Sequence, residues 1–143
     1  MAEESNQGMQ NYVKALNKLY NENDAMYYND QDPMGFEWIN CNDNERSIYS
    51  FVRRGSTAKK QLLFVSNFTP MDRDGFIVGV PCAGKYTEVL NSDAVEFGGK
   101  GSGIVTAGYP ALHFVGAVRV IKTHPAGGGN LAVIGGHPDI PVT

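Results

Sequence analysis

The stretch of sequence that decides the fold runs from residue 36 to residue 90, and it opens with FEWINC at 36–41 and IYSFVR at 48–53. Aromatic and β-branched residues dominate both runs, and the turn-forming letters NDNE at 42–45 separate them. Three further runs of the same kind follow, at residues 62–66, 76–80 and 85–90. Five short strands at spacings of roughly ten to fifteen residues predict an all-β fold, an antiparallel β-sandwich.

A single helix is predicted before these strands, over residues 6–23. Its apolar residues recur at the spacings of three and four that are typical of an amphipathic helix. They are Met9, Val13, Leu16 and Tyr20, with Tyr12 and Leu19 beside them. A helix of this length is marginal on its own, so its apolar stripe needs a partner surface. We expect the helix to dock imperfectly on the strands or to pair with a second copy of the chain.

The end of the chain changes in composition and is rich in glycine from residue 98 to residue 103. Beyond it, the sequence predicts a long strand at 111–122 and a short strand at 131–134. The letters THPAGGG at 123–129 form a turn between them.

Composition and charge exclude several classes of protein. With 143 residues, the chain predicts one domain with a single core. A net charge of −3 argues against a nucleic-acid or anionic-membrane partner, because phosphate contacts need clustered Lys and Arg. The chain has no apolar run of about 18 residues, and its acidic start MAEESN is unlike a signal peptide. Cys41 and Cys82 fit no metal-binding spacing, so we expect reduced thiols and a cytoplasmic location.

The side chains that could carry chemistry form no recognisable catalytic pattern. The carboxylates considered are Glu37, Asp43, Glu45, Glu88, Asp93 and Glu96. A glycoside-processing site needs two carboxylates opposed across the bond, which a sequence alone does not show, and we interpret these residues as solvated turn and strand-edge residues. His113, His124 and His137 are eleven and thirteen residues apart, which matches no zinc pattern. The segment 98–103 lacks the first Gly and the Ser or Thr of a phosphate-binding loop. We therefore expect no catalytic residue, metal or cofactor in this chain.

Three aromatic residues are candidates for contact with carbohydrate: Trp38, Tyr27 and Tyr28. An exposed aromatic ring can stack on a pyranose, whereas a buried ring belongs to a core. For Trp38 we favour packing at the junction between helix and strands. Phe36 falls on the same face of the strand, and two large aromatic rings on one face need a cover.

Several of these runs, taken in order, resemble the C-terminal end of bacterial 1,4-α-glucan (glycogen) branching enzymes. The resemblance covers residues 7–99. It rests on VKALNKLY at 13–20, FEWI at 36–39, NFTP at 67–70, VGVP at 78–81 and VLNSD at 89–93. From residue 101 onward the sequence departs from the family. The strands after about residue 100 are therefore either the closing hairpin of the family or an unrelated tail.

The resemblance implies a division of the chain and a role for it. Residues 1–31 would be the last helix of a (β/α)8 catalytic barrel with its linker, and residues 32–143 would be the C-terminal β-sandwich. Family members cleave an α-1,4 glucan and rejoin the segment through an α-1,6 bond, using an Asp and a Glu of the barrel. No position here corresponds to either, so we expect the chain not to be catalytic by itself.

The implied partners are the catalytic barrel of the same polypeptide and an α-glucan such as glycogen or amylose. The role we expect is to stabilise and orient the barrel, with contact to long glucan chains. The alternatives are a free-standing carbohydrate-binding module and a purely structural interaction domain. An autonomous hydrolase is the least favoured.

Overall fold

The computed structural model describes residues 2–57, 60–69, 76–79, 84–99, 112–114, 117–120 and 130–138. The chain begins with one α-helix, α1 (Ala2–Glu22), followed by two short 3-10 helices, η1 (Asp24–Met26) and η2 (Pro33–Gly35). A third 3-10 helix, η3 (Val95–Phe97), follows the fifth strand. The described strands are β1 (Phe36–Asp43), β2 (Ile48–Arg54), β3 (Gln61–Asn67), β4 (Phe76–Gly79), β5 (Gly84–Asn91), β6 (Leu112–Phe114), β7 (Ala117–Val120) and β8 (Asn130–Pro138).

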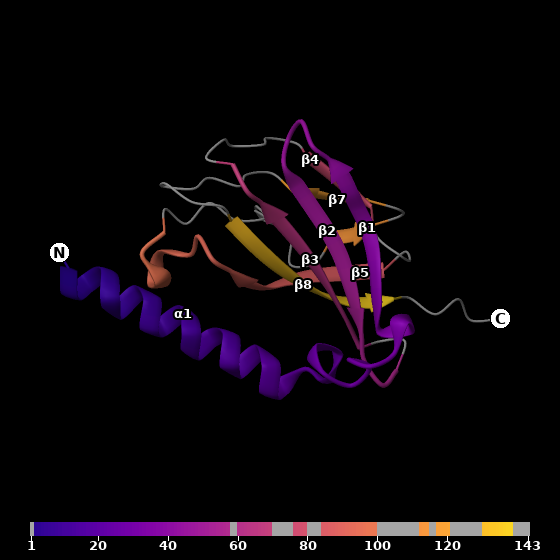
Figure 1. The fold of residues 1–143 in the computed structure, drawn as a ribbon, viewed down its shortest axis with the longest axis horizontal. Helices are drawn as coiled ribbons and strands as arrows, with labels where there is room; N and C mark the ends of the chain where they lie inside the picture. Colours follow the sequence, from indigo (N-terminus) through magenta and orange to yellow (C-terminus); the bar gives the residue numbers. More distant parts are fainter. Residues whose placement is uncertain are drawn as a thin grey trace.

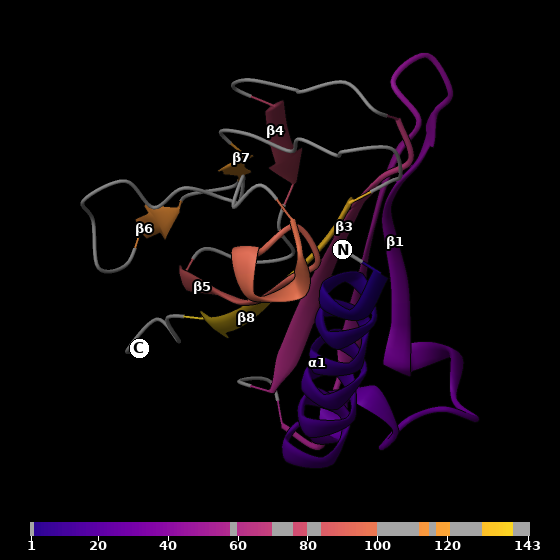
Figure 2. The ribbon, with the colours of Figure 1, turned by 90° about the vertical axis from the view of Figure 1, so that its left-hand side faces the viewer.

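The strands form two antiparallel sheets, which Figures 1 and 2 show from two sides. The large sheet has the order β1-β2-β3-β8-β5-β6, and the small sheet pairs β4 with β7. All-β architecture with one preceding helix was the sequence-based prediction, and it is confirmed. The first five predicted strands also agree with β1 to β5 in order and approximate bounds.

The centre of the large sheet is buried on both faces, because β2 and β3 are rich in apolar residues that alternate between them. On one face Val52, Leu63 and Val65 are almost fully buried. The small sheet lies close to this region, since a Cβ atom built on Gly79 would come within 3.3 Å of the Cγ2 of Ile39. The two sheets therefore enclose one part of the core.

The helix α1 covers the other face of the large sheet, and it does so with residues that share a core with the strands. That core contains Leu19, Ala25, Leu62, Phe64 and Leu90, which come from α1, η1, β3 and β5. The helix adds three partly buried residues to it, Tyr12, Ala15 and Leu16. The docked helix lies beside β3, β5 and η3 in Figures 1 and 2.

A close approach between α1 and η3 fixes where the helix lies. A Cβ atom on Gly8 would come within 2.7 Å of the carbonyl oxygen of Phe97, so only glycine fits this crossing without a shift. One turn further along the helix, the Tyr12 ring meets the Phe97 ring edge-on with centroids 5.3 Å apart. Burial raises the pKa of the Tyr12 hydroxyl. The helix is thus seated on the β domain over several turns.

The C-terminal strands differ from the sequence-based prediction. Within the long strand predicted at 111–122, the structure describes two short strands: β6 pairs with β5 in the large sheet, and β7 pairs with β4 in the small sheet. The closing hairpin, one of the two alternatives for this segment, is not formed by the described strands, because β8 lies between β3 and β5 and β7 pairs with β4. The physical reason is that β8 can bond neighbours on both sides at that place, and local periodicity does not reveal such distant pairings. His124 and the glycine-rich residues 100–103 lie outside the described residues.

Candidate functional site

The helix α1 carries a second apolar face that the core does not use. Met9, Val13 and Tyr20 are 62%, 47% and 46% exposed. Spacings of four and seven place them on one side of the helix, about 100° around its axis from the buried Leu19. The predicted stripe therefore splits, because Leu16 packs on the core and the other three face outward.

The outward face continues from the helix onto η1. The Tyr20 and Tyr27 rings lie 5.3 Å apart, and Tyr27 is 43% exposed. We call Met9, Val13, Tyr20 and Tyr27 the outer apolar face. Sequence reasoning located three of these residues but treated Tyr12 and Leu19 as flanking positions, whereas in the structure they form the buried side of the helix.

A network of charges and hydrogen bonds fastens η1 to the β2–β3 hairpin. Asp24 accepts hydrogen bonds from Ser56 Oγ at 2.5 Å and from Lys60 Nζ at 2.9 Å. These two hydrogen bonds, that of Lys60 foremost, hold the pKa of Asp24 below its usual range. The hydrogen bond to Asp24 in turn raises the pKa of Lys60. Sequence reasoning missed Asp24, because its partners lie more than thirty residues away.

Arg53 makes a second connection from the sheet to η1. Its Nε donates to the carbonyl of Ala25 at 3.3 Å and one terminal nitrogen donates to the carbonyl of Met26 at 3.0 Å. It also forms an ion pair with Asp30. Together the two networks fix the orientation of η1 and hence of Tyr27 on the outer apolar face.

Trp38 stands on β1 in a row of aromatic rings that crosses three strands. Its indole meets Phe36 at 5.2 Å and Phe51 at 5.7 Å, both edge-on. Phe51 stacks on the buried Phe64 at 4.7 Å. The expectation that Phe36 and Trp38 share a face is confirmed. The expectation that Trp38 is covered is wrong for this chain, since 51% of its surface is exposed at the end of the row.

Tyr27 and Tyr28, the other two carbohydrate-contact candidates, are both exposed, Tyr28 at 58%. The structure does not place them in the aromatic row: Tyr27 packs on Tyr20 of the helix, while Trp38 packs on Phe36 and Phe51. The backbone N–H of Tyr28 donates to the carbonyl of Asp24 at 2.7 Å, which places it at the end of η1. Tyr27 and Trp38 therefore pack in different pairs of aromatic rings.

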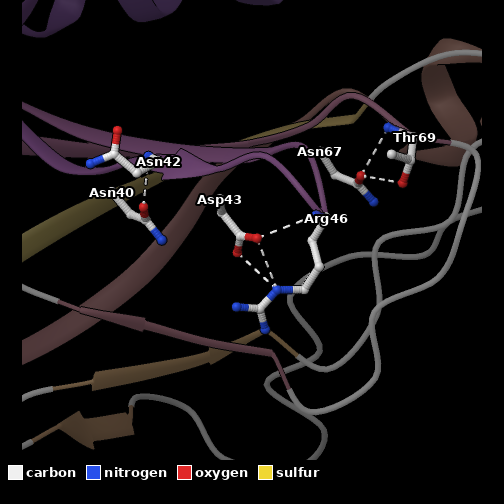
Figure 3. A network of polar contacts seen from close by, with 6 residues as sticks. All are labelled: Asn40, Asn42, Asp43, Arg46, Asn67 and Thr69. Atoms are coloured by element: carbon white, nitrogen blue, oxygen red, sulfur yellow. Dashed lines mark hydrogen bonds and ion pairs between the residues drawn. The ribbon is translucent and has the colours of Figure 1, made fainter.

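Asp43, one of the carboxylates considered from the sequence, has a structural role in the turn between β1 and β2 (Figure 3). Asp43 is buried and forms an ion pair with Arg46, with 2.9 Å between Oδ2 and Nε. Nearby, Asn67 Oδ1 accepts hydrogen bonds from the backbone N–H and the hydroxyl of Thr69. These contacts stabilise the strand ends, so Asp43 is a structural residue.

Other carboxylates of the described part also face cations. Glu37 pairs with Arg54, and Asp30 pairs with Arg53. Among the described residues, no group of three or more His, Cys, Asp or Glu side chains could hold a metal ion. No helix in the described part of the chain is both long and apolar enough to cross a membrane.

Comparison with known proteins gives one family match and many relatives. Residues 38–115 match the family described as the alpha amylase, C-terminal all-beta domain. The chain is 52% identical over 99 residues to the 1,4-alpha-glucan branching enzyme GlgB of Butyrivibrio fibrisolvens. The aligned segment covers 69% of this chain and 16% of that enzyme. It is 47% identical over 100 residues to the enzyme of the same name from Synechococcus sp. (strain WH7803), covering 70% of this chain and 13% of the relative.

The resemblance to the C-terminal part of bacterial branching enzymes is thereby confirmed. The chain spans only about a sixth or less of the length of these relatives. The family match extends over more than half of the chain, beginning within β1 and ending after β6. The chain therefore belongs to the α-amylase C-terminal all-β domain family.

Proposed function

We propose that this chain is the C-terminal β domain of a 1,4-α-glucan branching enzyme, and that it holds the catalytic barrel of such an enzyme in place. The family and the names of the relatives support the proposal. The observation that carries it is the outer apolar face of α1 and η1. The inner side of the helix already belongs to the β-domain core, so the outer side is available for a second body.

The apolar character of this face suits a protein partner. Large apolar side chains that gather on one surface of a soluble protein mark interaction sites more often than chance exposure. Burying a side chain such as Val13 or Tyr20 in an interface is worth roughly 1.5 to 3 kcal/mol before the costs of association. The partner we propose is the barrel, since most of the length of each relative lies outside the matched segment.

The division of the chain at residue 31 gains a physical meaning in this proposal. Residues 1–31 would belong to two bodies at once, with Leu19 on the β-domain side and Val13 on the barrel side. A helix that is apolar on two sides can pack on both domains at once, and such packing fixes the orientation of one domain relative to the other. The chain would thus act on catalysis through position and stability.

Direct catalysis would need two carboxylates that face each other across the glycosidic bond at about 5 to 10 Å. In the described part of the chain, Asp43 and Glu37 are ion-paired with arginines. We therefore propose that the bond-breaking acids belong to the barrel and that the isolated chain does not turn over amylose.

A chimeric enzyme tests the docking proposal. The matched segment of the Butyrivibrio fibrisolvens relative is replaced by the corresponding residues of this chain, and the product is assayed for branching by iodine staining and for thermal unfolding. Val13→Asp places a charge on the outer apolar face. Gln10→Asp is the matched control, because Gln10 is exposed on the same helix but outside that face.

The two variants separate docking from helix stability. We expect Val13→Asp to lower the melting temperature and the activity of the chimera, while Gln10→Asp leaves both near the parent values. In the monomeric isolated chain, Val13→Asp should change stability by no more than about 0.5 kcal/mol, because Val13 is 47% exposed and lies outside the shared core. Equal behaviour of the two variants in the chimera would contradict the proposal.

A second candidate function is direct contact with α-glucan, and the exposure of Trp38 favours it. A half-exposed indole that neighbouring rings hold in place can present a surface to a pyranose. Tyr27 and Tyr28 would be contacts of a separate surface. Trp38 is the only tryptophan, so a change in its fluorescence on titration with maltoheptaose has one source. No change up to millimolar sugar would contradict this role for Trp38.

Self-association is the remaining use of the outer apolar face. In the absence of a barrel, two copies of the chain could cover it for each other. Sedimentation of the isolated chain should then show a dimer that Val13→Asp dissociates. A dimer that persists in this variant would mean that the copies pair through some other surface.

A further inference from the structure

A groove lies between α1, β5 and η3, on the opposite flank of the helix from Val13 and its neighbours. Its volume is about 640 Å³. Small-ligand sites usually occupy about 300 to 1,000 Å³, so the groove has room for more than one sugar ring. Leu19, Leu90 and Phe97 give it an apolar floor, and all three also belong to or pack on the core shared by helix and strands. The floor is therefore preformed.

The rim of the groove is polar and carries an excess of negative charge. Glu22 and Lys18 line it from the helix, and Glu88 and Glu96 line it from the β-domain side. Lys18 Nζ lies 4.0 Å from Glu22 Oε1, and Glu96 adds a further carboxylate to this rim, which disfavours a phosphate or another anion. Carboxylates are strong acceptors for hydroxyl groups. An apolar floor below such acceptors matches a neutral polyhydroxyl ligand, which has apolar ring faces and hydroxyl edges.

We propose that this groove binds a segment of neutral α-glucan, as a second sugar site separate from Trp38. The inference rests on the proposed function for the class of sugar and on the groove itself for the place. Glu22 and Glu96 accept hydroxyl hydrogen bonds, and the Phe97 ring contacts a pyranose. The Tyr12 ring packs edge-on against the Phe97 ring.

The position of the groove has a mechanical consequence. A ligand here contacts α1 through Lys18 and Glu22 and contacts the β domain through Glu96 and Phe97. It can bind only when the helix is docked, so ligand binding stabilises the docked arrangement by mass action. Glucan would then strengthen the attachment between the β domain and the helix that it shares with the barrel.

Calorimetric titration with maltoheptaose tests the site on the isolated chain. All variants carry Trp38→Ala, which removes the other proposed sugar contact. Removing both rim acceptors with Glu22→Ala and Glu96→Ala should weaken binding about tenfold or more, since each lost hydrogen bond to a charged acceptor has a sizeable effect. Glu45→Ala is the matched control, as an exposed carboxylate on the β1–β2 turn.

Hydrogen exchange supplies the second readout. Maltoheptaose should slow exchange of the last turns of α1 in the Trp38→Ala chain and should not do so in the chain that also lacks Glu22 and Glu96. Binding that survives loss of both acceptors would overturn the groove site, and so would binding that Trp38→Ala abolishes. Absence of any glucan binding would also overturn it, while the chimera with Val13→Asp would still decide the docking proposal.

Discussion

Leu19→Ala probes whether α1 belongs to the core of the β domain. Leu19 is 6% exposed and lies in one cluster with Leu62, Phe64 and Leu90 of the strands. Replacing a buried leucine by alanine costs about 2 to 5 kcal/mol. The groove beside Leu19 lets neighbouring side chains move towards the space that the substitution leaves. We therefore expect a loss of about 3 kcal/mol in the free energy of unfolding. For a chain of this size, that corresponds to a fall of about 10 °C in the melting temperature.

The assay is thermal and urea unfolding of the isolated chain followed by circular dichroism. Val13→Ala is the matched control on the same helix, because Val13 is 47% exposed. It should change the melting temperature by less than about 2 °C. The shared core would be refuted if Leu19→Ala lowered the free energy of unfolding by less than about 1 kcal/mol while the chain kept its helix content. The helix would then be an appendage, and the β domain would have its own complete core.

Three further changes test other contacts. Gly8→Ala should destabilise the chain by about 1 kcal/mol despite the better helix propensity of alanine, because the new methyl group meets the Phe97 carbonyl; a higher melting temperature would show that the crossing is loose. The pKa of Asp24 is lowered in the folded chain, so its contribution to the free energy of unfolding is present above its ordinary pKa and is lost as the pH falls through the folded value. The difference in stability between the parent chain and Asp24→Asn should therefore close below about pH 4. A difference that stays constant in melts at decreasing pH would contradict the contact with Lys60. Trp38→Ala should cost about 1.5 to 2.5 kcal/mol in a urea titration, roughly half of the value for a buried ring, and a loss above about 3 would mean that the ring is covered in solution.

The class of fold could be predicted from the sequence because its signals are local. Runs such as 48–53 alternate and are closed by turn residues, and β2 indeed spans Ile48–Arg54. The pairing of distant strands has no such local signal. The position of β8 between β3 and β5 depends on backbone hydrogen bonds between segments that are more than forty residues apart in sequence.

The candidate site could be predicted only in part, because only some of its signals are local. Helical periodicity identified Met9, Val13 and Tyr20, but it could not tell which of two neighbouring apolar faces meets the sheet. That choice depends on Gly8, whose lack of a side chain lets η3 approach one side of the helix. The exposure of Trp38 was not predicted either. A large aromatic residue on a strand suggests burial, but the sequence does not show whether a surface that covers the ring is present.

Oxidative footprinting of Met9 tests most directly whether a catalytic barrel covers the outer apolar face. Met9 and Met34 are both well exposed in the chain, at 62% and 73%, and Met34 lies on η2, outside that face. Hydroxyl-radical oxidation of the two residues is measured by mass spectrometry in the isolated chain and in the chimeric branching enzyme. If the barrel covers this face, the rate at Met9 falls several-fold in the chimera relative to the rate at Met34. Equal relative rates in the two proteins would contradict it.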